Sequence, residues 1–317
     1  MNCAMNKPIS IFAVALTIFF TLALFSSYTG NETVDSIRTT AQKTNAVSGQ
    51  LPQIIKAVDL NRPFSFAGEA LPMENSDVLE RLDHELLRNS YYHSHTILAI
   101  KRARRFFPII ESILAEEGVP DDMKFLAVAE SNLANAVSPA GAKGVWQFMK
   151  GTGQDYKMEI NSQVDERYHL EKATRAACKY LKSKKEKFGS WTLAAAAYNM
   201  GSSRLTKEMN LQRMSNFYDL NLNQETSKYV FRIVALKEIL SRPQDFGFYI
   251  DEEEKYAPLK DYILLEVDGA IENIGDFAKK HNTSYRAIKQ YNPWLVSSAL
   301  TNKNRKKYIL KIPKGKF

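Results

Sequence analysis

Apolar positions in the middle of the chain recur with the spacing of helices. Between Asn75 and about Arg242 they repeat every three or four residues, and alternating strand-like runs are almost absent. In segment 225–240, for example, Tyr229, Ile233 and Leu236 fall on one face. Glycine and proline mark expected breaks at residues 118–120, 138–141, 151–153, 189–190 and 201. The pattern predicts a mainly α-helical domain over residues 75–245.

The pattern changes after Pro243. Residues 262–267 and 308–312 have the composition of strands, and two short helical patterns, 271–281 and 284–291, lie between them. This order predicts a small α+β module, β-α-α-β, over residues 246–317. A unit of this size has a marginal core, and binding modules of this size are common.

The N-terminal segment has the features of an export signal. Lys7 is the only charged residue before Glu32, and the run 9–25 is continuously apolar. The run is slightly longer than a typical signal-peptide core and near the lower limit for a membrane span. Residues 1–29 are therefore predicted to be a signal peptide or an uncleaved anchor, and both interpretations stay open. Residues 30–74 are predicted to be a tether.

An export signal places the protein in the cell envelope. We expect a periplasmic protein, either released or anchored to the inner membrane through residues 9–25. The polar stretch from Tyr28 to about Gln50 is rich in Thr, Ser, Asn and Gly and has no periodicity, as is typical of a linker.

Composition narrows the class of protein. With 317 residues, two domains are expected, and 44% hydrophobic residues exclude wholesale disorder. The formal net charge of +8 favours anionic partners, but nucleic acid, anionic lipid and acidic cell-wall polymer all satisfy it. The only cysteines, Cys3 and Cys178, form no CxxC or Cys/His cluster, so neither a disulfide framework nor a structural zinc site is predicted. No cofactor or metal is expected.

Glu130 is the candidate catalytic acid. It lies near the end of a helical segment that starts after Pro120 and is otherwise apolar. A carboxylate beside the free carbonyls of a helix end and among apolar neighbours should have a raised pKa. General acid catalysis near neutral pH requires such a carboxyl group, although a solvated glutamate at a helix end is the more frequent interpretation of the helix alone.

Aromatic and amide side chains follow in two clusters. The first comes directly after the glycine-rich loop 138–144, and the second ends the helical segment 190–201. Aromatic faces pack on sugar rings, and amides bind hydroxyl and acetamido groups, so the clusters indicate a saccharide site. Taken alone, an aromatic residue on a helix more often belongs to the core than to a sugar-binding surface. The clusters consist of Trp146, Gln147, Phe148 and Met149, and of Tyr198 and Asn199.

In this order the motifs resemble a known family. Glu130 and Ser131, the run 141–149, the run 197–201, and Glu225 with Thr226 resemble the lytic transglycosylase domain of the soluble-type and membrane-bound D-type families. The resemblance spans residues 119–240. It implies a lysozyme-like helical fold and an enzyme, a peptidoglycan lytic transglycosylase. Such enzymes cleave the bond between N-acetylmuramic acid (MurNAc) and N-acetylglucosamine (GlcNAc) and close a 1,6-anhydro ring on the MurNAc.

The resemblance also implies a role for each matching residue. Glu130 would be the single acid/base, first protonating the glycosidic oxygen and then accepting the proton of the C6 hydroxyl. The internal hydroxyl replaces the second carboxylate of a hydrolase. Glu225 is either an acid near the cleft or a group stabilising the start of the last helix. The implied substrate-binding residues are Ser131, Gln147, Met149, Tyr198, Asn199 and Glu225.

The C-terminal module resembles a degenerate LysM glycan-binding repeat. The usual Gly-Asp-Thr-Leu is replaced by Val-Asp-Gly-Ala-Ile at 267–271. Asn292 and Trp294 either contact N-acetyl sugars or form a structural turn. The expected partner is the glycan strand of peptidoglycan.

Two other functions remain open. One is a lysozyme- or chitinase-type hydrolase on the same fold, and the other is a non-catalytic wall-binding protein. Nucleic acid is not expected as a partner, because the chain has an export signal and no recognition motif.

Overall fold

The structure, a computed structural model, describes residues 56–314. The apolar run 9–25, with the signal or anchor expected there, lies outside these residues. Within 56–314, no helix is both long and apolar enough to cross a bilayer. The predicted fold class is confirmed: a helical domain is followed by a small α+β module.

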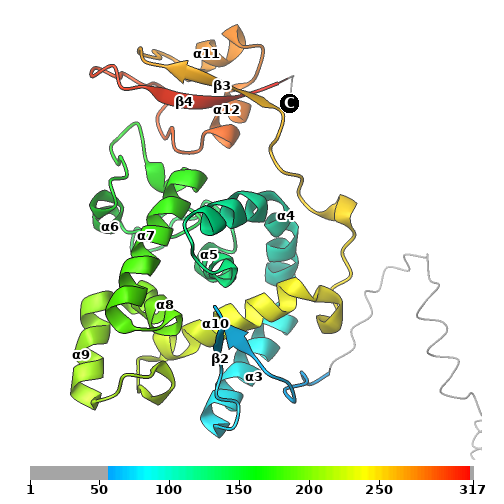
Figure 1. The fold of residues 1–317 in the computed structure, drawn as a ribbon. Helices are drawn as coiled ribbons and strands as arrows, with labels where there is room; N and C mark the ends of the chain where they lie inside the picture. The colour runs from blue at the N-terminus through cyan, green and yellow to red at the C-terminus, as the bar shows by residue number, and fades with distance from the viewer. Residues whose placement is uncertain (1–55, 315–317) are drawn as a thin grey trace, which may run out of the picture. The chain divides into compact units, whose positions relative to one another are not determined.

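The helical domain begins with a short hairpin and continues through eight helices of the described chain (Figure 1). Their bounds are β1 Ser65–Phe66, β2 Glu69–Ala70, α3 Ser76–Tyr91, α4 His93–Glu116, α5 Lys124–Ser131, α6 Lys150–Asp155, α7 Leu170–Phe188, α8 Trp191–Met200, α9 Ser202–Gln212 and α10 Gln224–Ser241.

Local sequence sets where the main helices start and stop. The side chains of Ser190 and Asn223 accept hydrogen bonds from the backbone N–H groups of Leu193 and Thr226, both at 3.0 Å, and so cap α8 and α10. Gly189 follows α7 in the left-handed conformation, with φ of 83°. These boundaries agree with the breaks expected at 189–190 and 201.

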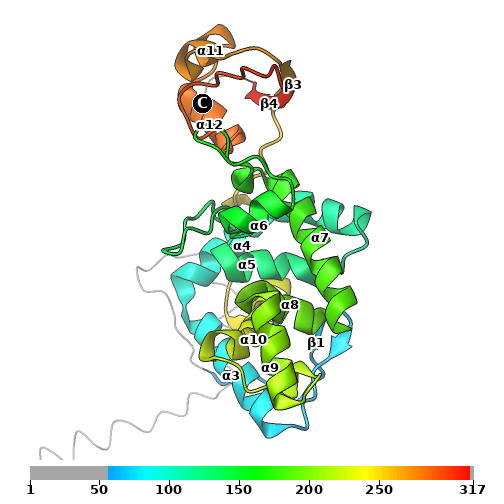
Figure 2. The same ribbon diagram turned by 90° about the vertical axis from the view of Figure 1, so that its left-hand side faces the viewer.

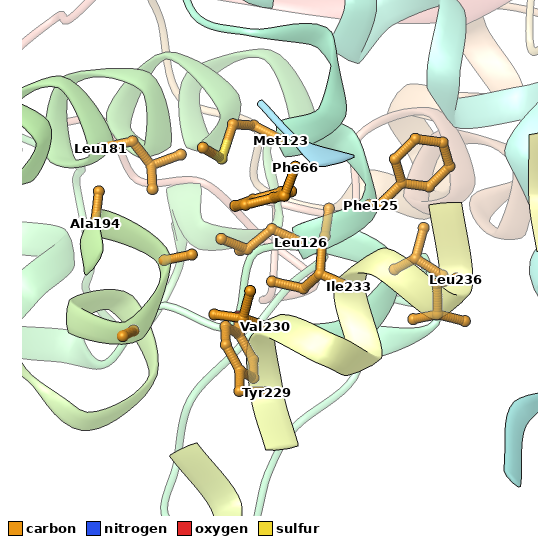
Figure 3. Packing of buried hydrophobic residues seen from close by; sticks show 14 of the residues in the cluster. Phe66, Met123, Phe125, Leu126, Leu181, Ala194, Tyr229, Val230, Ile233 and Leu236 are labelled. Carbon is orange, nitrogen blue, oxygen red and sulfur yellow. The ribbon is translucent and has the colours of Figure 1, made fainter. Parts of the chain in front are cut away.

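Helix α10 organises the core. It packs against α3, α5 and α8, and α5 in turn contacts α4 (Figure 2). Leu126 of α5 is fully buried, as are Val230 and Ile233 of α10, and Figure 3 shows these side chains close together. Burying each such side chain contributes about 1.5–3 kcal/mol. This packing fixes the end of α5, which carries Glu130, against the start of α10.

The folded domain starts earlier than the tether predicted over 30–74. Phe64, Phe66 and Leu71 are buried in the main core. Ser65 pairs with Ala70 across the β1–β2 hairpin. The tether prediction is therefore wrong for this part, because alternating apolar residues in a segment this short give too weak a strand signal to read from the sequence.

The break expected at 151–153 is also wrong, since these residues lie inside the short helix α6. A Cβ on Gly153 would come within 2.8 Å of the Ile160 side chain. The glycine therefore allows close packing of α6 and does not end a helix.

The C-terminal module has the predicted β-α-α-β order. Its elements are β3 Tyr262–Val267, α11 Ile274–Lys280, α12 Tyr285–Tyr291 and β4 Tyr308–Pro313 (Figure 1). The strands are antiparallel, with Tyr262 opposite Pro313 and Val267 opposite Tyr308. Asn292 is fully buried, and its amide bonds the backbone of Ile288 and Lys311. Asn292 therefore forms a structural turn.

Candidate active site

Glu130 lies in the last turn of α5, where the chain leaves the helix through the left-handed residue Asn132. As a whole residue, Glu130 is half-buried. The hydroxyl of Tyr229, from α10, donates a hydrogen bond to Oε1 of Glu130. Tyr229 is itself only 2% exposed, so the donor is held in place by the core.

The pKa of Glu130 is raised, as the sequence predicted. Its pKa is about 7, above the usual 4.5, chiefly because of burial, and the negative charge of Glu225 also favours the protonated form. The Tyr229 hydroxyl and the positive charge of Arg232 act in the opposite direction. At neutral pH a substantial fraction of Glu130 is therefore protonated, as a general acid requires.

Arg232 links the two other carboxylates of the site. Its guanidinium donates to Glu225 Oε1 at 3.0 Å and to Glu85 Oε2 at 3.3 Å. Glu85 is fully buried, whereas the Glu225 side chain is 60% exposed. The cap of α10 is Asn223, so the side chain of Glu225 pairs with Arg232 and does not cap the helix.

Three of the predicted site residues hold the loop 141–149, which we call the active-site loop. Ser131 Oγ donates to the carbonyl of Val145 at 2.7 Å, and the Tyr198 hydroxyl donates to that of Trp146 at 2.6 Å. Gln147 Nε2 donates to the carbonyl of Gly144 at 2.7 Å. These bonds place the loop beside the end of α5. The predicted contacts of these residues with sugar stay predictions.

Tyr198 also lies close enough to Glu130 for the charge of that residue to affect its pKa. Burial raises the pKa of Tyr198 well above 10, and the charge of Glu130 raises it further. The ring of Tyr198 makes edge contacts with Phe148 and Tyr180, at centroid distances of 5.8 and 5.1 Å. A neutral hydroxyl is therefore fixed near the carboxyl group.

The remaining predicted residues differ in their surroundings. Asn199 Oδ1 accepts a hydrogen bond from Thr226 Oγ1 at 2.7 Å, which links α8 to α10. Met149, just before the start of α6, is 46% exposed, and within the described residues its side chain makes no hydrogen bond that links two helices. Trp146 is fully buried and donates to Thr174, so it belongs to the core and not to a sugar platform.

Sequence reasoning missed Tyr229, Arg232 and Glu85 as site residues. Tyr229 is 99 residues from Glu130 in the chain, and the helical pattern assigned it to a core face. The local signal was a polar hydroxyl on an otherwise aliphatic face, which by itself gives no partner.

Comparisons with known proteins agree with this geometry. Residues 107–221 match the family described as transglycosylase SLT domain, and residues 264–316 match the soluble lytic transglycosylase C-terminal LysM-like domain. The resemblance inferred from the sequence is thereby confirmed. Glu130 and the active-site loop lie inside the SLT match, and Tyr229 lies beyond its end.

Two relatives to which this chain is similar are membrane-bound lytic murein transglycosylases D. The protein of Escherichia coli strain K12 is 28% identical over 247 residues, covering 75% of this chain and 53% of the relative. The protein of Escherichia coli O6:H1 gives the same values. The chain spans about half the length of the curated relatives it matches.

Within residues 56–314, no group of three or more His, Cys, Asp or Glu side chains is placed to hold a metal ion.

Proposed function

We propose that this chain is a peptidoglycan lytic transglycosylase, with Glu130 as its single acid/base. It would cleave the β-1,4 bond between MurNAc and GlcNAc without water and leave 1,6-anhydro-MurNAc ends. The observation that carries the proposal is the raised pKa of Glu130, about 7, in a carboxyl group that also accepts the Tyr229 hydroxyl. The SLT match over residues 107–221 supports the substrate class.

In the first step, protonated Glu130 gives its proton to the glycosidic oxygen while the bond from that oxygen to MurNAc C1 breaks. The GlcNAc product leaves with the proton, and positive charge develops on the MurNAc ring. Glu130 becomes a carboxylate, which the Tyr229 hydroxyl stabilises by its hydrogen bond.

In the second step, the C6 hydroxyl of the same MurNAc attacks C1 and closes the ring. Its proton passes to the Glu130 carboxylate, which restores the acid for the next cycle. Because the nucleophile is part of the substrate, its effective concentration is high and no second catalytic carboxylate is needed.

The other carboxylates near Glu130 support a single acid/base. Glu85 is fully buried and paired with Arg232, so it cannot reach a substrate. Glu225 is exposed but is also paired with Arg232, at 3.0 Å. A hydrolase of this fold would need a second carboxylate to activate water or attack C1. Glu225, which reaches solvent, is held in its ion pair with Arg232 and is not free for that role.

The products distinguish the two reactions. Purified glycan strands digested in H₂¹⁸O should give MurNAc ends that are lighter by one water and contain no ¹⁸O, as measured by mass spectrometry. A hydrolase would give reducing ends that carry ¹⁸O, and this result would refute the ring closure. The reducing ends made by a lysozyme in the same solvent serve as the positive control.

We further propose that the protein acts in the cell envelope, with peptidoglycan glycan strands as its partner. The relatives named as membrane-bound murein transglycosylases support this location. The division into a catalytic domain up to residue 245 and a module from residue 246 is part of the proposal. The periplasmic location, the signal or anchor and glycan binding by the module stay predictions.

A further inference from the structure

Residues 159–171, which we call the connecting segment, join the C-terminal module by backbone pairing. The backbone N–H of Asp165 donates to the carbonyl of Trp294 at 2.9 Å, and that of Val296 donates to Gln163, also at 2.9 Å. Val164 is 1% exposed and belongs to the core of the module. The module therefore completes its core with a residue of the helical domain.

Side chains extend this contact along both ends of the segment. The hydroxyl of Tyr308 donates to Glu159 at 3.0 Å, and Lys311 pairs with Glu171. The ring of Trp294 stacks on His169 at 5.7 Å and is only 4% exposed. Trp294 is consequently covered by the helical domain and is not offered to a sugar. These contacts fix the module in place, unlike a domain on a free tether.

The same segment holds the active-site loop from its other side. Arg167 is 4% exposed, and its Nη1 donates to the carbonyls of Gly141 and Phe148, both at 3.2 Å. Its other nitrogens bind Asp165, at 2.9 and 2.7 Å. Burial alone would raise the pKa of Asp165, but the bonds from Arg167 and the charge of Lys143 keep it below its usual value.

Asp165 therefore contacts both the C-terminal module and Arg167. Its backbone binds the module, and its carboxylate orients the arginine that ties together the two ends of the active-site loop. The carbonyls of Val145 and Trp146, within that loop, bind Ser131 and Tyr198 beside the catalytic carboxyl group. A buried ion pair with several hydrogen bonds is little screened by solvent and has a narrow range of geometries.

We propose that the docked C-terminal module is a positioning part of the active site, acting through Asp165 and Arg167 on the loop 141–149. Both are positioning residues, because neither contacts the reacting atoms. Loosening the module should therefore release the active-site loop while leaving the core around α10 unchanged.

Amide hydrogen exchange of the full chain tests this without reference to activity. The variant Tyr308→Phe/Lys311→Met removes the contacts with Glu159 and Glu171 and keeps the ring and most of the side-chain volume. Exchange in both 163–167 and 141–149 should become about fivefold faster or more, while exchange in α10 stays unchanged.

The matched control is Tyr285→Phe/Lys307→Met, which removes the same two groups from the module away from the connecting segment. Tyr285 is 43% exposed, and Lys307 pairs with Glu266 inside the module. The control should leave exchange in 141–149 unchanged. Faster exchange in 163–167 with an unchanged loop, or no change in either segment, would overturn the proposal.

Kinetics add a readout that rests on the proposed function. The loop carries predicted sugar contacts, so the Tyr308→Phe/Lys311→Met variant should raise KM for peptidoglycan about threefold and change kcat less than twofold. A faster-exchanging loop with an unchanged KM would contradict the positioning role. If the wild-type chain does not cleave peptidoglycan at all, the proposed function fails and the exchange result still decides whether the module holds the loop.

Discussion

Replacing Glu130 with glutamine should lower the turnover of peptidoglycan by about a thousandfold or more. Glutamine has nearly the same shape and still accepts the Tyr229 hydroxyl, but it has no proton to give to the leaving sugar. Because the proposed mechanism uses one group in both steps, no other residue replaces the loss. The measurement is the initial rate of release of soluble fragments from purified peptidoglycan.

Binding and stability separate a chemical loss from a folding defect. Glu130→Gln should bind peptidoglycan as the wild type does. It should also be more stable at pH 8, by up to about 3 kcal/mol, because the native state with a Glu130 pKa of about 7 is penalised when that group ionises. Because the pKa of Glu130 is higher in the folded than in the unfolded protein, its ionisation lowers the stability of the wild type. This loss of stability grows as the pH rises from 4.5 to 7 and is absent at pH 4.

The matched control for Glu130→Gln is Glu186→Gln, on the exposed surface of α7. It removes the same charge far from any predicted role and should leave turnover within twofold. If Glu130→Gln kept a tenth of wild-type turnover or more, the acid would be misassigned.

Gly144→Ala should cost about 3 kcal/mol or more of unfolding free energy. Gly144 has a φ of 80°, and a Cβ there would lie 2.0 Å from the backbone oxygen of Arg167. Backbone cannot move aside as a flexible side chain does, so the active-site loop must shift away from the connecting segment. Urea denaturation measures the loss, and KM for peptidoglycan should rise with it.

Gly141→Ala supplies the control in the same loop. Gly141 has a similar φ of 85°, but nothing lies within 4 Å of its added Cβ. Gly141→Ala should lower the unfolding free energy by only about 1 kcal/mol, the conformational cost of replacing glycine at this φ. Equal losses at the two positions would show that the contact with Arg167 does not constrain the loop.

Features encoded locally could be predicted from the sequence. Periodicity predicted helix α10 within one residue at each end, and the module's strands followed from their apolar runs. Glycines 189 and 201 marked helix ends correctly. Gly153 did not, because a glycine that permits close packing and a glycine that ends a helix look the same in one dimension.

Long-range pairs were beyond local reasoning. Nothing near Tyr229 indicates that its hydroxyl meets Glu130, and nothing near Val164 indicates that it enters the core of the module. The raised pKa of Glu130 was predicted from its helix, yet the balance of Tyr229, Arg232 and Glu225 around it depends on how α10 packs. The order of the motifs predicted which residues belong to the site. The packing of the helices determines which hydrogen bonds each of them makes.

The ionisation of Glu130 is the most direct test of the central claim. Titration of the side-chain carboxyl carbon by ¹³C NMR, with Glu130→Gln to assign the signal, should give a midpoint near 7. Tyr229→Phe should raise the midpoint further, because it removes a hydrogen bond that favours the carboxylate. A midpoint near 4.5 that Tyr229→Phe does not move would contradict the account, since the group would then be ionised and unable to donate a proton at neutral pH.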